Sequence, residues 1–113
     1  MLLVDDDILV SMGAADMLLD LGHSVTEAQS GIHALKLLET DSAFDIVVTD
    51  YAMPGMNGFE LAQRIKGRNP KLPIILATGY AELPVDRPIE FGHLSKPYTA
   101  NDLAAALEKA INS

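Results

Sequence analysis

Residues 46–55 read IVVTDYAMPG: a short apolar run, an aspartate after it, and then residues typical of a turn. The apolar run is too short for a helix, and its residues do not alternate with polar ones. Such runs are typical of strands that are covered on both faces, as in a parallel sheet packed between helices. The pattern predicts strands over Leu2–Val4, Ile46–Val48 and Ile74–Leu76, and weaker signals predict two more over Ser24–Ala28 and His93–Ser95.

Between these runs the apolar residues have the spacing of helices. We expect four helices: from about Ile8 to Leu21 with Gly22 as a stop, from a Ser30 cap to Thr40, from Asn57 or Gly58 to a stop at Pro70, and behind a capping box at residues 99–102. Their predicted inner faces contain, in chain order, Met12, Ala15, Leu18 and Leu19; Ile32, Leu35 and Leu38; Leu61 and Ile65; and Leu103, Ala106, Leu107 and Ala110.

Strands and helices therefore alternate along the chain. This alternation predicts the α/β class, with a three-layer sandwich whose five parallel strands are joined by right-handed crossovers. Pro84 and Pro88 oppose a regular helix, so we expect the helix between the fourth and fifth strands, within Gly79–Gly92, to be short or irregular. At 113 residues the chain has the size of one domain, residues 1–113.

The composition argues against several classes of function. Sixteen acidic residues against eight basic ones give a net charge of −8, which disfavours contact with nucleic acid or with an anionic membrane. The absence of cysteine excludes disulfides and thiolate metal sites. Because neither a secretory leader nor a membrane-spanning run is found, we expect a cytoplasmic location.

Polar side chains follow four of the predicted strands at their ends. Asp5 and Asp6 come directly after the first strand, and Asp50, Thr78 and Lys96 stand at the ends of the third, fourth and fifth. In doubly wound sheets the ligand site lies beyond the carboxyl ends of the strands, so these side chains should share one rim. Neighbouring carboxylates repel one another unless a cation neutralises them, and hard oxygen ligands favour Mg²⁺, with Mn²⁺ as a substitute. A hydroxyl and an amine suit phosphoryl oxygens, and a carboxylate can act as a nucleophile.

Simpler interpretations exist for the same acids. Asp5, Asp6 and Asp7 could form an acidic cluster at a helix N-terminus, where carboxylates cap free amides. Asp50 could initiate the turn at residues 53–55. Because all these side chains stand at corresponding strand ends, the functional interpretation is favoured for Asp5, Asp6 and Asp50, and Asp7 is left as the helix cap.

Four short motifs together resemble the receiver domains of response regulators in two-component signalling. They are Val4-Asp5-Asp6; Asp50 followed by Met53-Pro54-Gly55 and Asn57-Gly58; Ala77-Thr78-Gly79; and Lys96-Pro97-Tyr98. The resemblance covers essentially the whole chain. It implies a flavodoxin-like sheet in the order 2-1-3-4-5, as in chemotaxis receivers.

The resemblance also implies roles for individual residues. Asp50 matches the phosphoacceptor, and the Mg²⁺ ligands would be Asp5, Asp6, Asp50 and the backbone carbonyl of Ala52. Thr78 matches the switch hydroxyl that moves towards the phosphoryl group.

Three residues near the ends of the last two strands have implied supporting roles. Lys96 matches the lysine that pairs with the phosphoryl group. Gly79, which has no side chain, keeps the acceptor accessible. Pro97 matches the position of a cis peptide bond that would direct Lys96 inward.

Two further positions bear on the lifetime and the readout of the phosphoryl group. Tyr80 occupies a position that modulates the attack of water on phosphoaspartate, so its bulk either slows hydrolysis or is that of an ordinary half-exposed loop aromatic. His93 stands where the family usually has Tyr or Phe, whose rotation reports phosphorylation. The sequence leaves open whether histidine replaces that aromatic switch.

The implied partner is a histidine kinase or a histidine phosphotransfer domain, with slow hydrolysis or back-transfer as the reset. The short interval between Thr78 and Lys96 resembles receivers attached to hybrid sensor histidine kinases more than those that drive DNA-binding domains. We therefore expect a monomer that contacts neither nucleic acid nor membrane.

Two other functions compete with this one. Phosphatases of the haloacid-dehalogenase type also use an aspartate, Mg²⁺, a threonine and a lysine, but Leu9 breaks their first-strand pattern, and the acids after Lys96 lie on the final helix. A pseudo-receiver would keep the fold and signal without phosphate. The intact acids, Thr78 and Lys96 argue against it.

Overall fold

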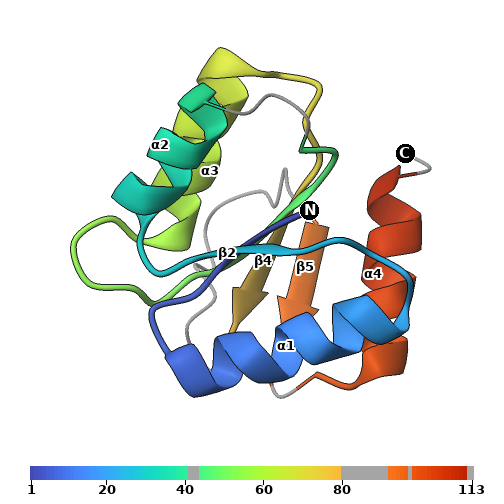
Figure 1. The fold of residues 1–113 in the computed structure, drawn as a ribbon. Helices are drawn as coiled ribbons and strands as arrows, with labels where there is room; N and C mark the ends of the chain where they lie inside the picture. Colours follow the sequence, from blue (N-terminus) through green and yellow to red (C-terminus); the bar gives the residue numbers. More distant parts are fainter. Residues whose placement is uncertain (41–43, 80–91, 97, 112–113) are drawn as a thin grey trace.

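The computed structural model describes residues 1–40, 44–79, 92–96 and 98–111 (Figure 1). In chain order the elements are β1 (Leu2–Val4), α1 (Ile8–Asp20), β2 (Thr26–Ala28), α2 (Gly31–Thr40), β3 (Val47–Asp50), α3 (Gly58–Arg68), β4 (Ile74–Thr78), β5 (Gly92–Ser95) and α4 (Ala100–Ile111). This is the predicted alternation of strands and helices. The short or irregular helix expected between the fourth and fifth strands falls on residues outside the described ones.

The five strands form one parallel sheet in the order β2-β1-β3-β4-β5. The predicted fold class and strand order are therefore confirmed. In the register of the sheet, Val4 pairs with Thr49, Asp50 with Ala77, and Thr78 with Ser95. The central strands consequently end almost level with one another, so that the residues which follow them meet at one edge.

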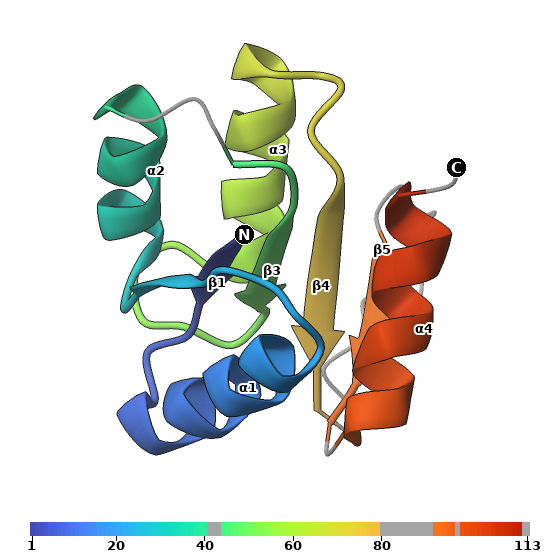
Figure 2. The ribbon, with the colours of Figure 1, turned by 45° about the vertical axis from the view of Figure 1, so that its right-hand side comes forward.

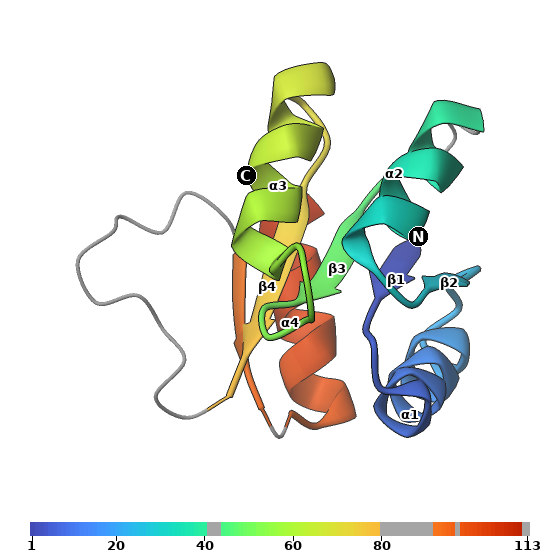
Figure 3. The same cartoon turned by 90° about the vertical axis from the view of Figure 1, so that its left-hand side faces the viewer.

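Helices cover both faces of the sheet (Figures 2 and 3). One core lies between the sheet and helices α1 and α4 and contains Leu3, Val48 and Ile75. The other lies under α2 and α3 and contains Leu2 and Val47. Adjacent residues of a strand thus enter opposite cores, which explains why the apolar runs show no polar alternation.

Several strand boundaries differ from the predicted ones, and β3 and β5 begin one residue away from the predicted start, at Val47 and Gly92. β3 and β4 continue through polar residues, to Asp50 and Thr78, because pairing with the next strand satisfies their backbones beyond the apolar run. β2 begins at Thr26 instead of Ser24. Apolar runs therefore mark only the apolar part of each strand.

The predicted inner faces of the first two helices are partly wrong. Met12, Leu19 and Ile32 are exposed, at 55%, 56% and 61% of their surface. The buried residues of these two helices are mostly small: Ser11, Ala14, Ala15 and Leu18 in α1, and Gly31 and Ala34 in α2. Small residues let a helix lie close to the layer beneath it, and large apolar side chains at the remaining positions then face solvent.

The third and fourth helices agree with their predictions. Both begin with a reciprocal cap, Asn57 with Glu60 and Thr99 with Asp102. Their predicted core residues Leu61, Ile65, Leu103 and Leu107 are buried. Among the described residues, no helix combines the length and the apolar character that crossing a membrane requires.

Candidate functional site

The carboxyl ends of β1 and β3 bring aspartates together. Because Val4 pairs with Thr49, the next residues of the two strands, Asp5 and Asp50, lie side by side. Only 4% of Asp5 and 5% of Asp50 is exposed, whereas Asp6 is exposed to solvent. One carboxylate oxygen from each of the three lies within 4.8 Å of the others. The three acids that were expected to share a rim do so.

Local hydrogen bonds hold these acids in place and separate Asp7 from them. The backbone N–H of Asp7 donates to Asp5 Oδ1 at 2.9 Å, which orients that carboxylate. The carboxylate of Asp7 itself accepts hydrogen bonds from the backbone N–H groups of Leu9 and Val10 and caps α1. The prediction that Asp7 is the helix cap is therefore confirmed.

Lys96 reaches the same cluster from the end of β5. Its Nζ lies 2.6 Å from Asp50 Oδ1 and 3.7 Å from Asp5 Oδ2. The backbone N–H of Lys96 donates to the carbonyl of Thr78 at 2.8 Å, which ties the lysine to the end of β4. Apart from this ammonium group, no described residue donates a hydrogen bond to the buried Asp50 Oδ1.

Burial dominates the electrostatics of the cluster. Burial raises the pKa of Asp5, and the hydrogen bond from Asp7 and the charge of Lys96 offset this only in part. Burial likewise raises the pKa of Asp50, in spite of Lys96. Burial alone would lower the pKa of Lys96, but its contact with Asp50 and the nearby Asp5 reverse the shift, and the net pKa is raised. The two buried carboxylates are thus short of positive charge.

The donor set fits a magnesium ion. It consists of three carboxylates, with no histidine or cysteine in the described cluster. An octahedral Mg²⁺ with oxygens at about 2.1 Å holds adjacent and opposite ligand oxygens about 3 to 4 Å apart, so a small contraction of the cluster suffices. The exposed position of Asp6 leaves room for the waters that Mg²⁺ retains. Asp5, Asp6 and Asp50 could therefore hold a Mg²⁺ ion, whose positive charge would offset the repulsion among the three carboxylates.

Thr78 lies at the same edge of the sheet but contacts a different residue. Its side chain is 1% exposed, and its Oγ1 lies 2.6 Å from Nε2 of His93, on β5. Among the described residues, the hydrogen-bond partner of the Thr78 hydroxyl is thus the imidazole of His93 and not a carboxylate. The hydroxyl therefore does not join the carboxylate cluster in this structure.

A family model described as the response regulator receiver domain matches residues 1–108. The chain belongs to the receiver domain family of response regulators. The resemblance that the four motifs indicated is confirmed, and with it the assignment to two-component signalling. The match gives no support to the phosphatase or to the pseudo-receiver alternative.

Relatives of this receiver domain occur in proteins of different architecture. The sensor kinase CckA of Brucella abortus (strain 2308) is 37% identical over 117 residues, which is 97% of this chain and 12% of CckA. The DNA-binding transcriptional regulator NtrC of Klebsiella pneumoniae is 33% identical over 116 residues, 97% of this chain and 24% of NtrC. The chain thus spans a quarter or less of the length of these curated relatives.

Solved structures share the fold of this receiver domain along almost its full length. A response regulator receiver domain protein from Clostridium thermocellum superposes with a TM-score of 0.89 at 30% identity, covering 98% of this chain and 92% of that one. The chemotaxis protein CheY4 of Vibrio cholerae superposes with a TM-score of 0.83 at 27% identity, covering 96% and 95%. The flavodoxin-like, chemotaxis-receiver-like fold is therefore shown.

One glycine supports the site of the receiver domain in a way that the sequence analysis missed. A Cβ atom on Gly58, the first residue of α3, would overlap the backbone carbonyl oxygen of Asp50 and press on the side chain of Leu76. Only glycine lets α3 begin this close to the end of β3. Gly58 was predicted only as a possible helix start. Its place within the Asn57-Gly58 motif is the signal that could have marked it as a support of Asp50.

Several predicted site residues remain without a structural test. Tyr80 and Pro97 lie outside the described residues. Ala52 is exposed two positions beyond Asp50, which is compatible with the predicted use of its carbonyl. Gly79 is half-buried directly after β4.

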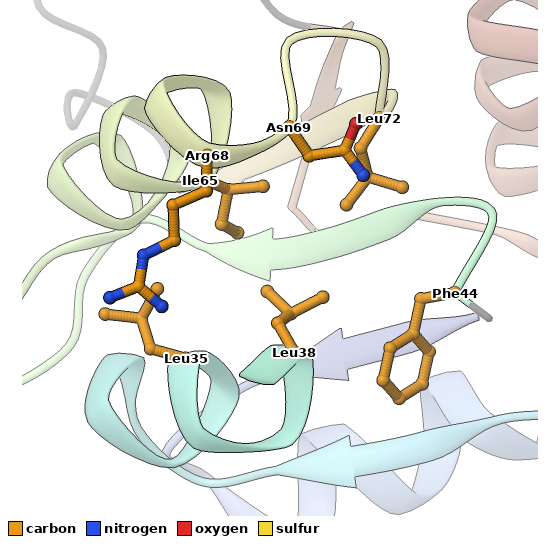
Figure 4. Close-up of a pocket in the computed structure, with 7 residues that line it drawn as sticks. All are labelled: Leu35, Leu38, Phe44, Ile65, Arg68, Asn69 and Leu72. Atoms are coloured by element: carbon orange, nitrogen blue, oxygen red, sulfur yellow. The ribbon is translucent and has the colours of Figure 1, made fainter. Parts of the chain in front are cut away.

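An apolar hollow lies at the opposite end of the receiver domain (Figure 4). It is lined by Leu35, Leu38, Phe44, Ile65, Arg68, Asn69 and Leu72. These residues come from α2, from the second half of α3 and from the segments that precede β3 and β4, so the hollow lies towards the amino ends of the strands. It shares no residue with the carboxylate cluster.

Proposed function

We propose that this receiver domain takes a phosphoryl group from a phosphohistidine onto Asp50. The observation that supports this proposal most is the position of the Asp50 carboxylate. It is buried at the edge where the strands end, beside two further acids and 2.6 Å from the Lys96 ammonium. An anionic nucleophile, a cation site and a compact positive charge are what transfer of a phosphoryl group to a carboxylate requires. A nucleophile at that edge is also within reach of a partner protein, because the adjoining Asp6 is exposed.

The transfer is a displacement in line at phosphorus. An Asp50 carboxylate oxygen forms the new O–P bond while the P–N bond to the donor imidazole breaks, and the imidazole retains the electron pair of that bond. Asp5, Asp6, Asp50 and the carbonyl of Ala52 would hold Mg²⁺, which neutralises charge on the transferred group when it is bound. Asp7 stays outside this set, because its carboxylate already accepts the first amides of α1.

Lys96 and Thr78 act on the product. Lys96 shifts from the Asp50 carboxylate to an oxygen of the phosphoryl group, since that carboxylate loses its full charge when it forms the acyl phosphate. The Thr78 hydroxyl donates a hydrogen bond to another oxygen and reports the modification to the segment that follows β4. Gly79 leaves the approach to Asp50 open. Slow hydrolysis or back-transfer resets the domain, and the bulk of Tyr80 retards the attack of water.

The partner surface in this proposal is the N-terminal half of α1. Ile8, Leu9 and Met12 are exposed there, and Leu9 exposes 81% of its surface. An apolar groove continues from this helix to the site, lined by Leu9, Val10, Gly13, Ala14, Met17, Lys96 and Tyr98. A helix that carries the phosphohistidine of a histidine kinase or a histidine phosphotransfer domain would cover these side chains and deliver its imidazole next to Asp50. The charge of −8 favours a donor with a basic surface.

The context of the domain belongs to the same proposal. The predicted similarity to receivers of hybrid kinases is supported by the match to the sensor kinase CckA, so we place the chain in such a relay as a monomer in the cytoplasm. The match to NtrC, a DNA-binding transcriptional regulator, represents the alternative context, in which a similar segment belongs to a protein that binds DNA.

Binding of beryllofluoride, an analogue of the phosphoryl group, tests the assignment. Titration of the wild-type protein with beryllofluoride and Mg²⁺, followed by backbone amide chemical shifts, should show saturable changes around Asp50 and Thr78. Asp50→Asn should abolish them, whereas Asp20→Asn, at the exposed end of α1, should leave them unchanged. Equal responses of Asp50→Asn and the wild type would show that the acceptor is elsewhere.

A further inference from the structure

The structure joins the switch hydroxyl to His93, whose role the sequence leaves open. Thr78 Oγ1 and His93 Nε2 are 2.6 Å apart, at the short end of the range for hydrogen bonds. Thr78 is fully enclosed, while His93 is half-buried on β5. A buried hydroxyl with a close partner has one preferred orientation, because rotation would leave it without that bond.

The order of the strands determines what this orientation means. β4 lies between β3, which ends in Asp50, and β5, which carries His93. Rotation about the Cα–Cβ bond of Thr78 therefore swings its hydroxyl towards one neighbouring strand or the other. A hydroxyl 2.6 Å from a β5 side chain is directed away from Asp50.

The alternation of side chains along the strands agrees with this geometry. On β5, Leu94 enters the core under α1 and α4, so His93 projects from the other face of the sheet. On β4, Ala77 enters that same core, and Thr78 shares the face of His93. Asp50 lies two residues after Val48 on β3 and therefore projects from the same face, the one covered by α1 and α4. Strand alternation thus places Thr78 and His93 on the same face of the sheet, where the two side chains meet, and the contact with His93 selects the orientation of the hydroxyl.

From this arrangement we infer that His93 is a positioning residue for phosphoryl binding, which holds the Thr78 hydroxyl in its resting orientation and competes with the phosphoryl group for it. The inference rests on the proposed function of Asp50. A phosphoryl oxygen at Asp50 gains the Thr78 hydrogen bond only after the bond to His93 breaks. The competition does not depend on which of the two groups donates the hydrogen, because it is the position of the oxygen that changes.

Population arithmetic gives the size of the effect. When only a fraction of molecules has the hydroxyl free, the apparent dissociation constant of a phosphoryl analogue is raised by the inverse of that fraction. A net hydrogen bond of ordinary strength corresponds to a factor of about 2 to 10. Removal of the imidazole should therefore tighten binding of the analogue by about 2- to 10-fold.

The test is a titration of the whole chain with beryllofluoride in the presence of Mg²⁺, carried out on matched variants. His93→Leu, which has no polar group, should bind about 2- to 10-fold more tightly than the wild type. His93→Gln, whose amide can replace Nε2 as hydrogen-bond partner, should stay close to the wild type. In the Thr78→Val background, which lacks the hydroxyl, His93→Leu should have no effect, since the interaction it removes is already gone.

A spectroscopic signal separates this role from simple packing. The ¹⁵N resonance of His93 Nε2 should shift when beryllofluoride binds to the wild type, because its hydrogen bond to Thr78 is lost, and should not shift in Thr78→Val. If the wild type responds to beryllofluoride but His93→Leu binds no more tightly, the inference about His93 is wrong and the proposed function stands. If the wild type gives no response, the proposed function fails and the inference fails with it.

Discussion

At the scale of single residues, burial is the main influence on the charge state of the carboxylates at this site. Asp5 and Asp50 are both buried, and the single ammonium of Lys96 faces them both. Burial raises the pKa of each acid. The folded state thus holds these two carboxylates in the charged form at a cost in stability, a trade that is common at functional sites.

Neutralising Asp50, the proposed acceptor, should therefore stabilise the protein. An acid whose pKa is raised on folding binds its proton more tightly in the folded state, so the penalty for ionisation grows as the pH rises from about 4 and is complete above the folded pKa. In the absence of Mg²⁺, Asp50→Asn should raise the free energy of unfolding at neutral pH, because burial raises the pKa of Asp50. The gain should fade as the pH falls towards 4.

Urea denaturation at neutral and at acidic pH measures this effect. Asp20→Asn is the control, because that aspartate is exposed at the end of α1. An Asp50→Asn variant that is less stable than the wild type at neutral pH would mean that the Lys96 ion pair outweighs burial.

The three adjacent aspartates allow a second comparison at this scale. Asp6→Asn removes a proposed metal ligand, whereas Asp7→Asn keeps a good helix cap and removes a similar charge. Mg²⁺ at a hundredfold excess over Kd should raise the free energy of unfolding of the wild type and of Asp7→Asn by about 2.7 kcal/mol. Their melting temperatures should rise accordingly. The shift should be much smaller for Asp6→Asn, and Mn²⁺ should give the same ranking. An equal loss in both variants would indicate diffuse attraction to negative charge instead of a defined site.

At the scale of elements, α3 lies close to the end of β3 and so supports the backbone of Asp50, the proposed acceptor. The reciprocal cap of Asn57 and Glu60 starts the helix, and Gly58 lets it begin against the backbone of Asp50. The cap was predictable from the residue types, because capping side chains act locally. The contact between Gly58 and Asp50 was not, because it joins two elements whose separation in space no periodicity encodes.

A pair of glycines in the same helix tests this contact. Gly58→Ala should lower the free energy of unfolding by about 1 to 3 kcal/mol, because the new methyl group must displace the Asp50 carbonyl or Leu76. It should also weaken beryllofluoride binding. At Gly67, near the end of α3, a Cβ would meet nothing within 4 Å, so Gly67→Ala should be about 1 kcal/mol more stable than the wild type. Urea denaturation of both variants would contradict this account if Gly58→Ala were as stable as Gly67→Ala.

Helix faces show a different limit of sequence reasoning. The faces of α3 and α4 were predicted correctly, because their large apolar residues are the buried ones. The face of α1 was wrong at Met12 and Leu19, since that helix buries mainly small residues. Exposed apolar side chains on α1 are then available for a partner, which a pattern of hydrophobicity alone cannot distinguish from a core.

At the scale of the whole molecule, the sheet assembles the site from residues that are far apart in the chain. Because all five strands are parallel, their carboxyl ends meet at one edge, and this edge collects Asp5, Asp50, Thr78 and Lys96. The sequence was sufficient to predict this gathering, since only strand positions and the rule for doubly wound sheets were needed. It did not predict the bond between Thr78 and His93, because that depends on side-chain orientation across β4 and β5.

The most direct test of the account is the location of a covalently bound phosphoryl group. The wild-type chain would be incubated with Mg²⁺ and a small phosphodonor such as acetyl phosphate, and its intact mass and its peptides would be measured at once. The account predicts one added phosphoryl group, on the peptide that contains Asp50, which requires Mg²⁺ and is lost in Asp50→Asn. No added mass in the wild type, or the same added mass in Asp50→Asn, would contradict it.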